Sequence, residues 1–566
     1  MFFFLLFGLF GLSNLSIFAI DEFTLTKDIF YHFDLNGQAA VEETVQLRNN
    51  LSQIYPTQYT LTLTGAGISQ VTGHDNYGNI VKDTTQTKDG QSTTINLNFN
   101  HPAVGKGQVT TFTILYRAKG LAKPKGNTWE ITLPPKETSV ILNSLKISVP
   151  NQFGPVAFAS VAQTSQEGIV SRLISLTPAK DDKILITFGD YQLFDFHLTH
   201  EIPNQQASPG FIKIPIPPDT GSQRVIFSNF SPRPKNITSD PDGNWLANYD
   251  LSPSSQTTIR ISGQVETFPA THPTAAPLPQ HTQSQSIWPI SDPQIITTAA
   301  NLKNPKAIYD YVISHLTYNY DLIKTPQRRG ALAALNDPAN SLCTEFTDLF
   351  VALARAKGIP SREVEGFALT NDPKIKPVNP NSDILHAWPQ YYDKIRQSWV
   401  DIDPTWGKTT NGVDYFSDLD LNHLTFVIHG LDSHNPPSPG SYRLSQDKTI
   451  DVSLSTVRVT PSNLPPTIDF DPSSSLPRLL LKNPNLHALK SVIVATSNWS
   501  WQTDSLPPLS TTPLTPKNPL SPKLNLSLSY HNQTLNLRLN LPRRSFFSWL
   551  TNAIIQLFAN HDQKNP

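Results

Sequence analysis

Alternating apolar and polar residues fill most of the first 268 positions of the chain. This alternation is the period of a β-strand with one buried face. The segments TQYTLTLTG, STTINLNFN and TTFTILYRA show it, and turn signals such as Gly105-Lys106-Gly107 separate such segments. We expect a β-sandwich domain at residues 21–150 and a second β domain at residues 151–268. The alternation returns later, and we expect a C-terminal β-sandwich at residues 441–541.

The pattern changes after residues 269–290, a proline-rich stretch that we interpret as a linker. From Asp292 onward, apolar residues recur at helical spacing. Asp292 and Asn304 each precede a proline, which is the arrangement of an N-cap followed by proline at the first helical position. We expect two helices here, at the start of a domain of mixed helices and strands at residues 291–440.

Residues 340–368 predict a helix with a cysteine in its first turn. Gly358 marks the end of this helix, and Asn340 or Ser341 can cap its start. The apolar residues at helical spacing predict a buried stripe, and they are Phe346, Leu349, Phe350 and Leu353. Cys343 is therefore expected at the N-terminus of a buried helix.

The position of Cys343 has a chemical consequence. It is the only cysteine in 566 residues, so the chain forms no internal disulfide and lacks the ligands of a thiolate zinc site. Free N–H groups and the helix dipole stabilise a thiolate there, and the thiolate is the nucleophilic form. The same N–H groups can stabilise an oxyanion. We interpret Cys343 as a nucleophile, with a buried structural thiol as the alternative.

A base and an acid follow in the segment DILHAWPQYYDKIRQSWVDIDPTW. His386 begins one predicted strand and Asp403 ends the next, and a turn near Lys394 would join the strands into a hairpin. The imidazole and the carboxylate can then be cross-strand neighbours, with the carboxylate holding the imidazole in the correct tautomer. Asp401 points to the same face as Asp403, so the spacing leaves both open as the orienting residue.

These segments resemble the core of the transglutaminase-like superfamily. The family pattern is a cysteine opening a helix that ends in Arg-x-x-Gly-Ile-Pro-x-Arg, then His-Ala-Trp, then Asp-Pro-Thr. The matching residues are Cys343, Arg355, Gly358, Ile359, Pro360, Arg362, His386, Ala387, Trp388, Asp403, Pro404 and Thr405. The resemblance covers about 291–432. Many relatives have glycine where this chain has Ser341.

The resemblance implies a papain-like α+β core, here flanked by all-β sandwich domains in a multidomain chain. It also implies that Cys343 is the nucleophile, His386 the general acid/base and Asp403 the orienting carboxylate. It leaves the second oxyanion donor unassigned. Trp388 and Trp406 are candidate walls of a substrate cleft, with packing in the core as the alternative.

The expected reaction is acyl transfer through a Cys343 thioester, with a Gln side chain or a peptide bond as the acyl donor. An amine acceptor would make the protein a transglutaminase, and water would make it a cysteine protease or amidase. A non-catalytic scaffold for binding or assembly at the cell surface is the alternative from a different class.

The near-neutral charge balance of the chain gives no indication of its binding partners. The chain has 44 Lys and Arg against 45 Asp and Glu, so no charge excess points to nucleic acid. We expect a protein or peptide substrate, no cofactor and no metal; the oligomeric state stays open. Residues 418–422 have the spacing at the start of a calcium loop, but His423 stands where that loop requires glycine.

The two ends of the chain bear on location. Phe2 to Leu12 form an apolar run of signal-peptide length, so we expect a signal peptide at residues 1–19 and secretion. An uncleaved N-terminal anchor is the alternative. Residues 542–566 predict a short apolar helix and tail, which either docks on a domain or lies at a membrane interface. Association with a membrane or the cell surface is therefore left open.

Overall fold

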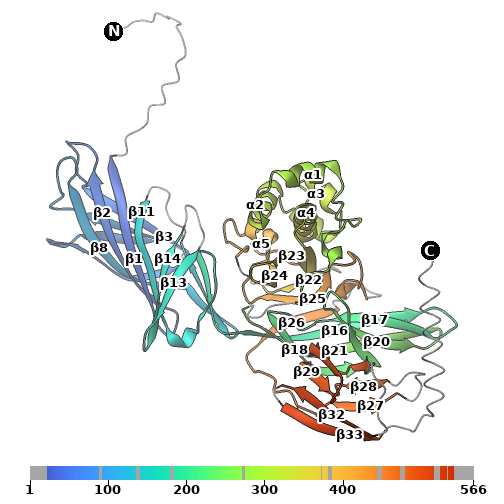
Figure 1. Cartoon of the computed structure of the whole chain (residues 1–566). Helices are drawn as coiled ribbons and strands as arrows, with labels where there is room; N and C mark the ends of the chain where they lie inside the picture. The colour runs from blue at the N-terminus through green and yellow to red at the C-terminus, as the bar shows by residue number, and fades with distance from the viewer. Residues whose placement is uncertain are drawn as a thin grey trace, which may run out of the picture. The chain divides into compact units, whose positions relative to one another are not determined.

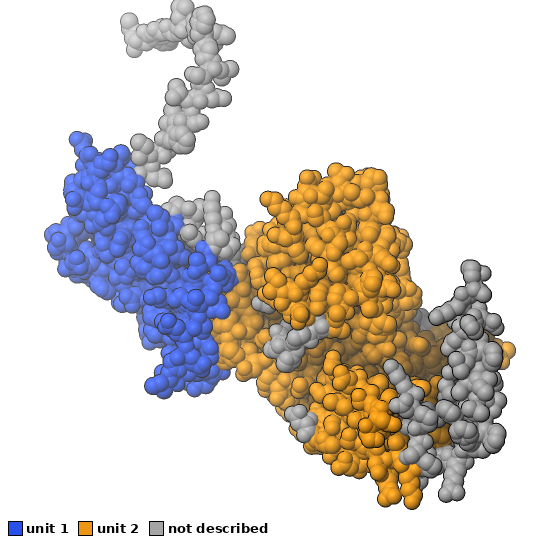
Figure 2. All heavy atoms as spheres, viewed as in Figure 1, with its two compact units in different colours: residues 1–123, 131–152, 161–182 blue, residues 124–130, 153–160, 183–566 orange. Residues whose placement is uncertain are grey.

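The computed structural model describes residues 22–87, 92–134, 140–178, 184–269, 275–370, 372–379, 385–417, 419–442, 449–471, 478–515, 523–531 and 533–540. About half of them lie in β-strands and few lie in helices, so the chain is mainly β and multidomain, as expected (Figure 1). They form two compact units, which Figure 2 colours separately. The predicted signal peptide (1–19) and the predicted C-terminal helix and tail (542–566) lie outside the described residues.

Unit 1 is drawn from residues 1–123, 131–152 and 161–182, and unit 2 from 124–130, 153–160 and 183–566. The large sheet of unit 1 has the spatial order β13 (Ala162–Glu167), β14 (Ser171–Thr177), β11 (Val140–Pro150), β1 (Phe23–Phe33), β2 (Ala39–Asn49), β8 (Val109–Lys119), β4 (Gly67–Asp75) and β5 (Gly78–Asn79). A smaller sheet has the order β3 (Gln58–Thr64), β7 (Ser92–Asn98) and β6 (Val81–Gln86). Buried and less buried residues alternate along β2, as the sequence pattern predicts.

The predicted domain boundary near Pro150 is not where the chain leaves unit 1. Strand β14 pairs antiparallel with β11, from Leu145 opposite Leu176 to Pro150 opposite Ser171. The sheet of unit 1 therefore continues past the predicted boundary. Alternation within a strand gives its buried face but does not identify the strand with which it pairs, so the sequence pattern misses this continuation.

Further sheets accompany the helices. One sheet has the order β12 (Val156–Ala159), β15 (Ile184–Phe188), β10 (Thr128–Leu133) and β9 (Ala122–Lys125). The second β domain contains a sheet of β18 (Gln223–Ser231), β21 (Ser255–Thr267), β16 (Gln192–Asn204) and β26 (Ile450–Ser455), and a sheet of β17 (Gly210–Ile216), β20 (Trp245–Leu251) and β19 (Asn236–Ser239). The C-terminal sheets are β27 (Thr467–Phe470), β28 (Leu479–Lys482) and β31 (Thr511–Leu514), and β30 (Ser500–Leu506), β29 (Leu489–Ala495), β32 (Lys523–Tyr530) and β33 (Gln533–Asn540). Strand β26 pairs with β16, so the chain returns to the second β domain before the C-terminal sheets begin.

The helical part of unit 2 contains the predicted cysteine helix. Its helices are α1 (Pro293–Ala300), α2 (Pro305–His315), α3 (Ala331–Asn336), α4 (Cys343–Ala356) and α5 (Pro404–Thr409). An antiparallel sheet has the order β24 (Ser398–Asp401), β23 (His386–Asp393), β22 (Ser361–Ala368) and β25 (His423–His429), and α4 packs on β23 and β22 (Figure 1). Among the described residues, no helix combines the length and apolar character needed to cross a bilayer.

The caps predicted for the first two helices are confirmed. The Asp292 side chain accepts from the backbone N–H of Gln294 at the start of α1. The Asn304 side chain accepts from Ala307 N–H at the start of α2. Each cap satisfies an N–H group that has no acceptor within its helix.

The predicted linker at 269–290 packs against the core in its described part. Trp288 is fully buried, and its indole N–H donates to Asp348 at 2.8 Å. His281 is also buried, with Nε2 2.8 Å from Asp242 Oδ1. The prolines predict an extended spacer, but the buried Trp288 and His281 hold residues 275–290 against the core of unit 2.

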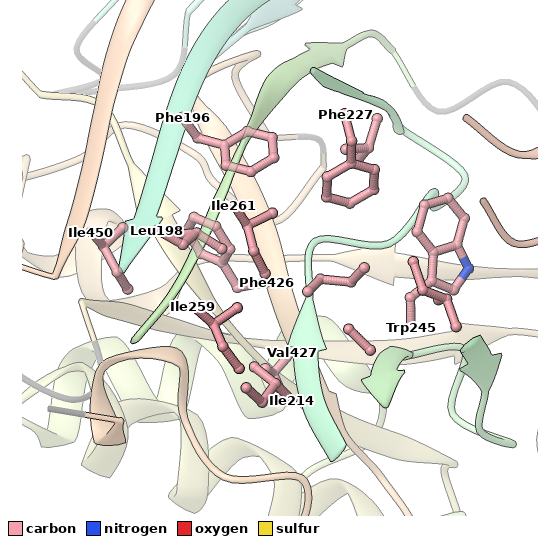
Figure 3. Packing of buried hydrophobic residues seen from close by; sticks show 14 of the residues in the cluster. Phe196, Leu198, Ile214, Phe227, Trp245, Ile259, Ile261, Phe426, Val427 and Ile450 are labelled. Carbon is pink, nitrogen blue, oxygen red and sulfur yellow. The ribbon is translucent and has the colours of Figure 1, made fainter. Parts of the chain in front are cut away.

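A shared hydrophobic core joins β25 to the second β domain (Figure 3). Phe426 and Val427 of β25 lie among buried residues of β16, β17 and β21, including Phe196, Ile214 and Ile261. All five side chains are at most 1% exposed. The strand at one edge of the helix-bearing sheet is therefore fixed by a core that belongs to another part of unit 2.

Candidate active site

Cys343 is the first residue of α4 and is 9% exposed. The predicted caps, Asn340 and Ser341, are wrong, because the N-cap is Leu342. The Glu345 carboxylate performs the capping from within the first turn, since its Oε2 accepts from Leu342 N–H at 2.9 Å. A side chain that reaches back to the cap gives no signal before the helix in the sequence.

Arg329 holds the other side of this carboxylate. Its backbone N–H donates to Glu345 Oε1 at 2.8 Å, and its guanidinium donates to the Asn340 carbonyl. The segment leading to Cys343 is therefore held by hydrogen bonds at Asn340 and at Leu342. The N–H of Cys343 lies just inside the cap, among the groups that have no acceptor within a helix, and can face an oxyanion.

His386 and Asp403 form a buried pair. His386 Nε2 lies 3.0 Å from Asp403 Oδ2, and both side chains are 0% exposed. His386 Nδ1 has no hydrogen-bond partner among the described residues, so it is the ring atom left for the Cys343 thiol. Burial opposes the charged imidazole, but Asp403 and the adjacent Cys343 favour it and raise the pKa of His386 to about 9.

The structure separates the two aspartates that the spacing leaves open. Asp401 is the last residue of β24, and its Oδ1 accepts from the indole N–H of Trp388 at 2.8 Å and from the Gln390 amide at 2.7 Å. Asp403 lies beyond the strand as the N-cap of α5, where its Oδ1 accepts from Trp406 N–H at 3.0 Å. The predicted hairpin exists, but Asp403 reaches His386 from a helix cap, not from a paired strand position.

A second histidine shares the Asp403 carboxylate. His423 Nε2 lies 3.2 Å from Asp403 Oδ2, and its Nδ1 lies 3.0 Å from Asp420 Oδ1. Lys376 Nζ lies 3.2 Å from Asp420 Oδ2, which also accepts from the Tyr415 hydroxyl at 3.3 Å. In the sequence, Asp420 and His423 stand out only through the calcium-loop spacing, and their link to Asp403 is visible only in the structure.

The predicted cleft residues are both buried and both surround the histidines. Trp406 is 0% exposed and packs on His386 and His423, with ring centroids 5.3 and 4.6 Å away. Trp388 is 1% exposed and meets His423 edge-on at 5.1 Å. A cavity of about 220 Å³ is lined by Trp388, Asp401 and His423, among others. The role of either tryptophan as a substrate wall stays a prediction.

Tyr318 lies beside the cysteine loop. It forms a parallel bridge with Ser341, two residues before Cys343. Burial, followed by the neighbouring Cys343, raises the pKa of Tyr318 well above its usual range. The phenol therefore remains a hydroxyl beside the thiol at every physiological pH, and the sequence gives no signal for it.

A separate ionic cluster joins α4 to β22. Arg328 reaches Asp348 at 2.5 Å, Glu363 at 2.7 Å and Glu365 at 3.5 Å, and the three carboxylates are at most 1% exposed. His429 Nδ1 lies 3.3 Å from Glu363 Oε2. The cluster therefore gathers three carboxylates around one guanidinium and one imidazole.

Two groups of described residues contain metal-ligand types within 4.8 Å of one another. They are His386, Asp403, His423 and Glu363, Glu365, His429. In the first group the facing atoms are joined by hydrogen bonds of 3.0 and 3.2 Å. In the second, Arg328 occupies the position of the cation. Both groups are therefore interpreted as ionic networks.

The stability of unit 2 should fall as the pH rises above about 6.5. His386, His423 and His429 have their pKa raised to about 9 in the folded state, from an ordinary value of 6.5. Their ionic stabilisation is therefore complete below about pH 6.5 and is lost as the pH passes through about 9, on the order of 1 kcal/mol or more for each. Thermal melts at pH 6.5 and 10 test this, and an equal or higher midpoint at pH 10 would contradict it.

Comparisons with known proteins agree with the motifs. Residues 291–404 match a family model described as the transglutaminase-like superfamily. Similar solved structures include a protein from Cytophaga hutchinsonii provisionally assigned as a cysteine protease (17% identity, 47% of this chain, 99% of that chain, TM-score 0.30) and the periplasmic domain of TgpA from Pseudomonas aeruginosa (14%, 39%, 92%, 0.22). An M1 zinc metallopeptidase from Deinococcus radiodurans also matches (14%, 32%, 45%, 0.21).

At these TM-scores the structural likenesses carry no argument about function, and no curated protein matches the chain. The family match covers Cys343, His386 and Asp403 and stops before His423. The family model therefore confirms the resemblance to the transglutaminase-like superfamily over residues 291–404.

Proposed function

We propose that the protein is an enzyme that transfers acyl groups through a thioester on Cys343, with Gln side chains or peptide bonds as donors. One observation carries the proposal. The only cysteine begins a buried helix beside His386, whose Nε2 is bound to Asp403 at 3.0 Å and whose Nδ1 is left for the thiol. A helix packed on an antiparallel sheet also supports the expected papain-like core.

The first half of the reaction forms the thioester. His386 Nδ1 takes the proton of the Cys343 thiol, and the thiolate attacks the carbonyl carbon of the donor. The carbonyl electrons move to oxygen, where the N–H of Cys343 can stabilise the oxyanion. When the oxyanion collapses, the C–N bond breaks and His386 returns the proton to the departing ammonia or amine. Asp403 holds the imidazole throughout.

The second half releases the acyl group. An amine or a water molecule attacks the thioester, gives a proton to His386 and displaces the Cys343 thiolate, which regains the proton. An amine yields an amide, and water yields a carboxylic acid. The buried surroundings of His386, with Trp406 stacked at 5.3 Å, limit water near the base and support the amine as acceptor.

We also propose that the reaction takes place outside the cytoplasm. The support is the apolar run from Phe2 to Leu12, which has the length of a signal peptide. The test is to separate expressing cells from their medium, divide the cells into soluble and membrane fractions, and detect the chain in each. We expect it outside the soluble cytoplasmic fraction.

Mass spectrometry of the full chain tests the reaction. The protein is incubated with a Gln-rich protein and a small primary amine, and Cys343→Ala is the blank. Amine incorporation with loss of ammonia, absent from the variant, is the expected result. Cleavage or deamidation that depends on Cys343 would establish a hydrolase on the same residues. No Cys343-dependent product, together with a thiol that resists alkylation, would overturn the proposal and leave the surface scaffold.

A further inference from the structure

His423 lies between two carboxylates. Its Nε2 faces Asp403 Oδ2 at 3.2 Å, and its Nδ1 faces Asp420 Oδ1 at 3.0 Å. Ionised carboxylates only accept hydrogen bonds, so each contact requires a proton on the ring nitrogen that makes it. A ring with both nitrogens protonated is an imidazolium. The hydrogen bonds therefore give His423 a positive charge.

The surroundings keep that charge in place. Asp420 is bound by Lys376 Nζ at 3.2 Å, by the Tyr415 hydroxyl at 3.3 Å and by the N–H of Asn422 at 3.2 Å. Burial opposes the charged carboxylate, but Lys376 and His423 hold the pKa of Asp420 well below its usual range. Burial likewise opposes the His423 cation, and Asp403 and Asp420 raise its pKa to about 9.

His423 and His386 share one oxygen. Both Nε2 atoms point to Asp403 Oδ2, at 3.2 and 3.0 Å, and the ring centroids are 5.8 Å apart. The titratable and charged groups around the two rings include Cys343, Asp401, Asp403, Lys376, Tyr415 and Asp420. The neighbouring Tyr309 and Tyr318 also act on Asp403, and Lys125 acts on Asp420.

We propose that His423 is a positioning residue for the reaction at Cys343, because as an imidazolium at neutral pH it orients Asp403 and keeps His386 less basic than Asp403 alone would make it. The inference rests on the proposed function, since it assigns a task within the same site. His386 must accept a proton from the thiol and then give it up to the leaving group. If His386 holds its proton too strongly, it transfers that proton poorly to the leaving group.

The size of the effect follows from the distance. A positive charge about 6 Å from a second imidazole, partly screened by protein, disfavours protonation by about one to two pKa units. Asp403 stays ionised between the two rings, with its pKa lowered to about 2 by His386 and His423 against the effect of burial. Removing the His423 charge should therefore leave the whole attraction of Asp403 acting on His386.

The test is the pH profile of Cys343 alkylation by iodoacetate between about pH 4 and 11, using the full chain. The acid limb reports thiolate formation, and the alkaline limb reports loss of the His386 proton that attracts the anionic reagent. His423→Gln keeps an N–H donor toward Asp403 and removes the charge. We expect its alkaline limb to move up by about one to two pH units.

His429→Gln is the matched control. His429 ends the strand that His423 begins, and it is also buried beside carboxylates, but its partners are Glu363 and Glu365. Its profile should match that of the wild-type chain. An alkaline limb that stays in place or moves down in a folded His423→Gln chain would overturn the inference.

A second measurement needs no variant. The ¹⁵N chemical shifts of His423 in the wild-type chain at pH 7.5 should show both ring nitrogens protonated, and a neutral ring would overturn the inference. The proposed function fails separately, when the wild-type thiol shows no enhanced alkylation near neutral pH. A reactive wild-type thiol with an unmoved His423→Gln profile removes only the role of His423.

Discussion

Replacing Asp403 with asparagine should slow acylation of Cys343 by about 10³–10⁴-fold and leave the fold intact. Asparagine can still accept from Trp406 N–H, so the cap of α5 survives. The charge that holds His386 is lost, and an amide N–H facing Nε2 favours the tautomer with the proton on Nδ1. That tautomer cannot take a proton from the thiol. The rate of thioester formation with a Gln peptide and the thermal midpoint measure the two effects separately.

Asp401→Asn is the control for this prediction. Asp401 lies two residues away and accepts hydrogen bonds from Trp388 and Gln390, and within the part of the chain that the structure describes no hydrogen bond joins its side chain to Cys343, His386 or Asp403. Its rate should fall by less than about tenfold, which is small beside the loss of an orienting carboxylate. If Asp401→Asn is as slow as Asp403→Asn, or if Asp403→Asn keeps a near-normal rate, the assignment of Asp403 fails.

Replacing Arg328 with methionine should destabilise unit 2 by about 3–5 kcal/mol, because it leaves buried carboxylates without their cation. Arg328 lies within 2.5–3.5 Å of Asp348, Glu363 and Glu365. His429 pairs with Glu363 and Glu365, so it compensates only two of the three carboxylates in the described ion pairs. The free energy of unfolding in urea, measured at pH 7.5, gives the loss directly.

The same variant should regain stability as the pH falls. Without Arg328, the carboxylates are expected to bind protons near neutral pH, so acid relieves the uncompensated charge. The deficit against wild type should therefore be smaller at pH 5 than at pH 8. Arg396→Met is the control, since Arg396 pairs with Asp393 at 3.8 Å on an exposed turn and should change the stability by less than about 0.5 kcal/mol. An equal effect of the two variants would contradict the prediction.

The candidates for nucleophile and base are predictable from sequence because each stands in a short contiguous motif. Cys343 opens a helix whose apolar spacing is plain, and the four stripe residues are all fully buried. His386 begins a strand, as expected. The structure places Cys343 beside His386 and His386 against Asp403, and their catalytic roles stay predictions.

The choice between Asp401 and Asp403 depends on where a strand ends. Alternation places both on one face, but only if β24 continues through Asp403. The strand ends at Asp401, and the chain turns into α5, so the rule for strands does not reach the second aspartate. Pro404 was the available signal, because proline at a first helical position favours a capping residue before it.

His423 is not predictable from its own segment. It reaches Asp403 because β25 pairs with β22, through contacts such as Ala368 opposite His423. That pairing joins distant parts of the chain, and alternation does not specify it. The boundaries of the β domains are missed for the same reason, as the pairing of β14 with β11 shows.

The two attachments of β25 bear on where the chain can be cut. The family match ends at residue 404, but the strand that supplies His423 begins 19 residues later and buries Phe426 and Val427 in the core of the second β domain. A fragment trimmed to the recognisable core would lose one edge of its sheet. A fragment that kept β25 without residues 184–268 would expose an aliphatic and aromatic face to water. The smallest fragment of this chain that folds as an independent module is therefore larger than residues 291–404, the segment that the family model matches.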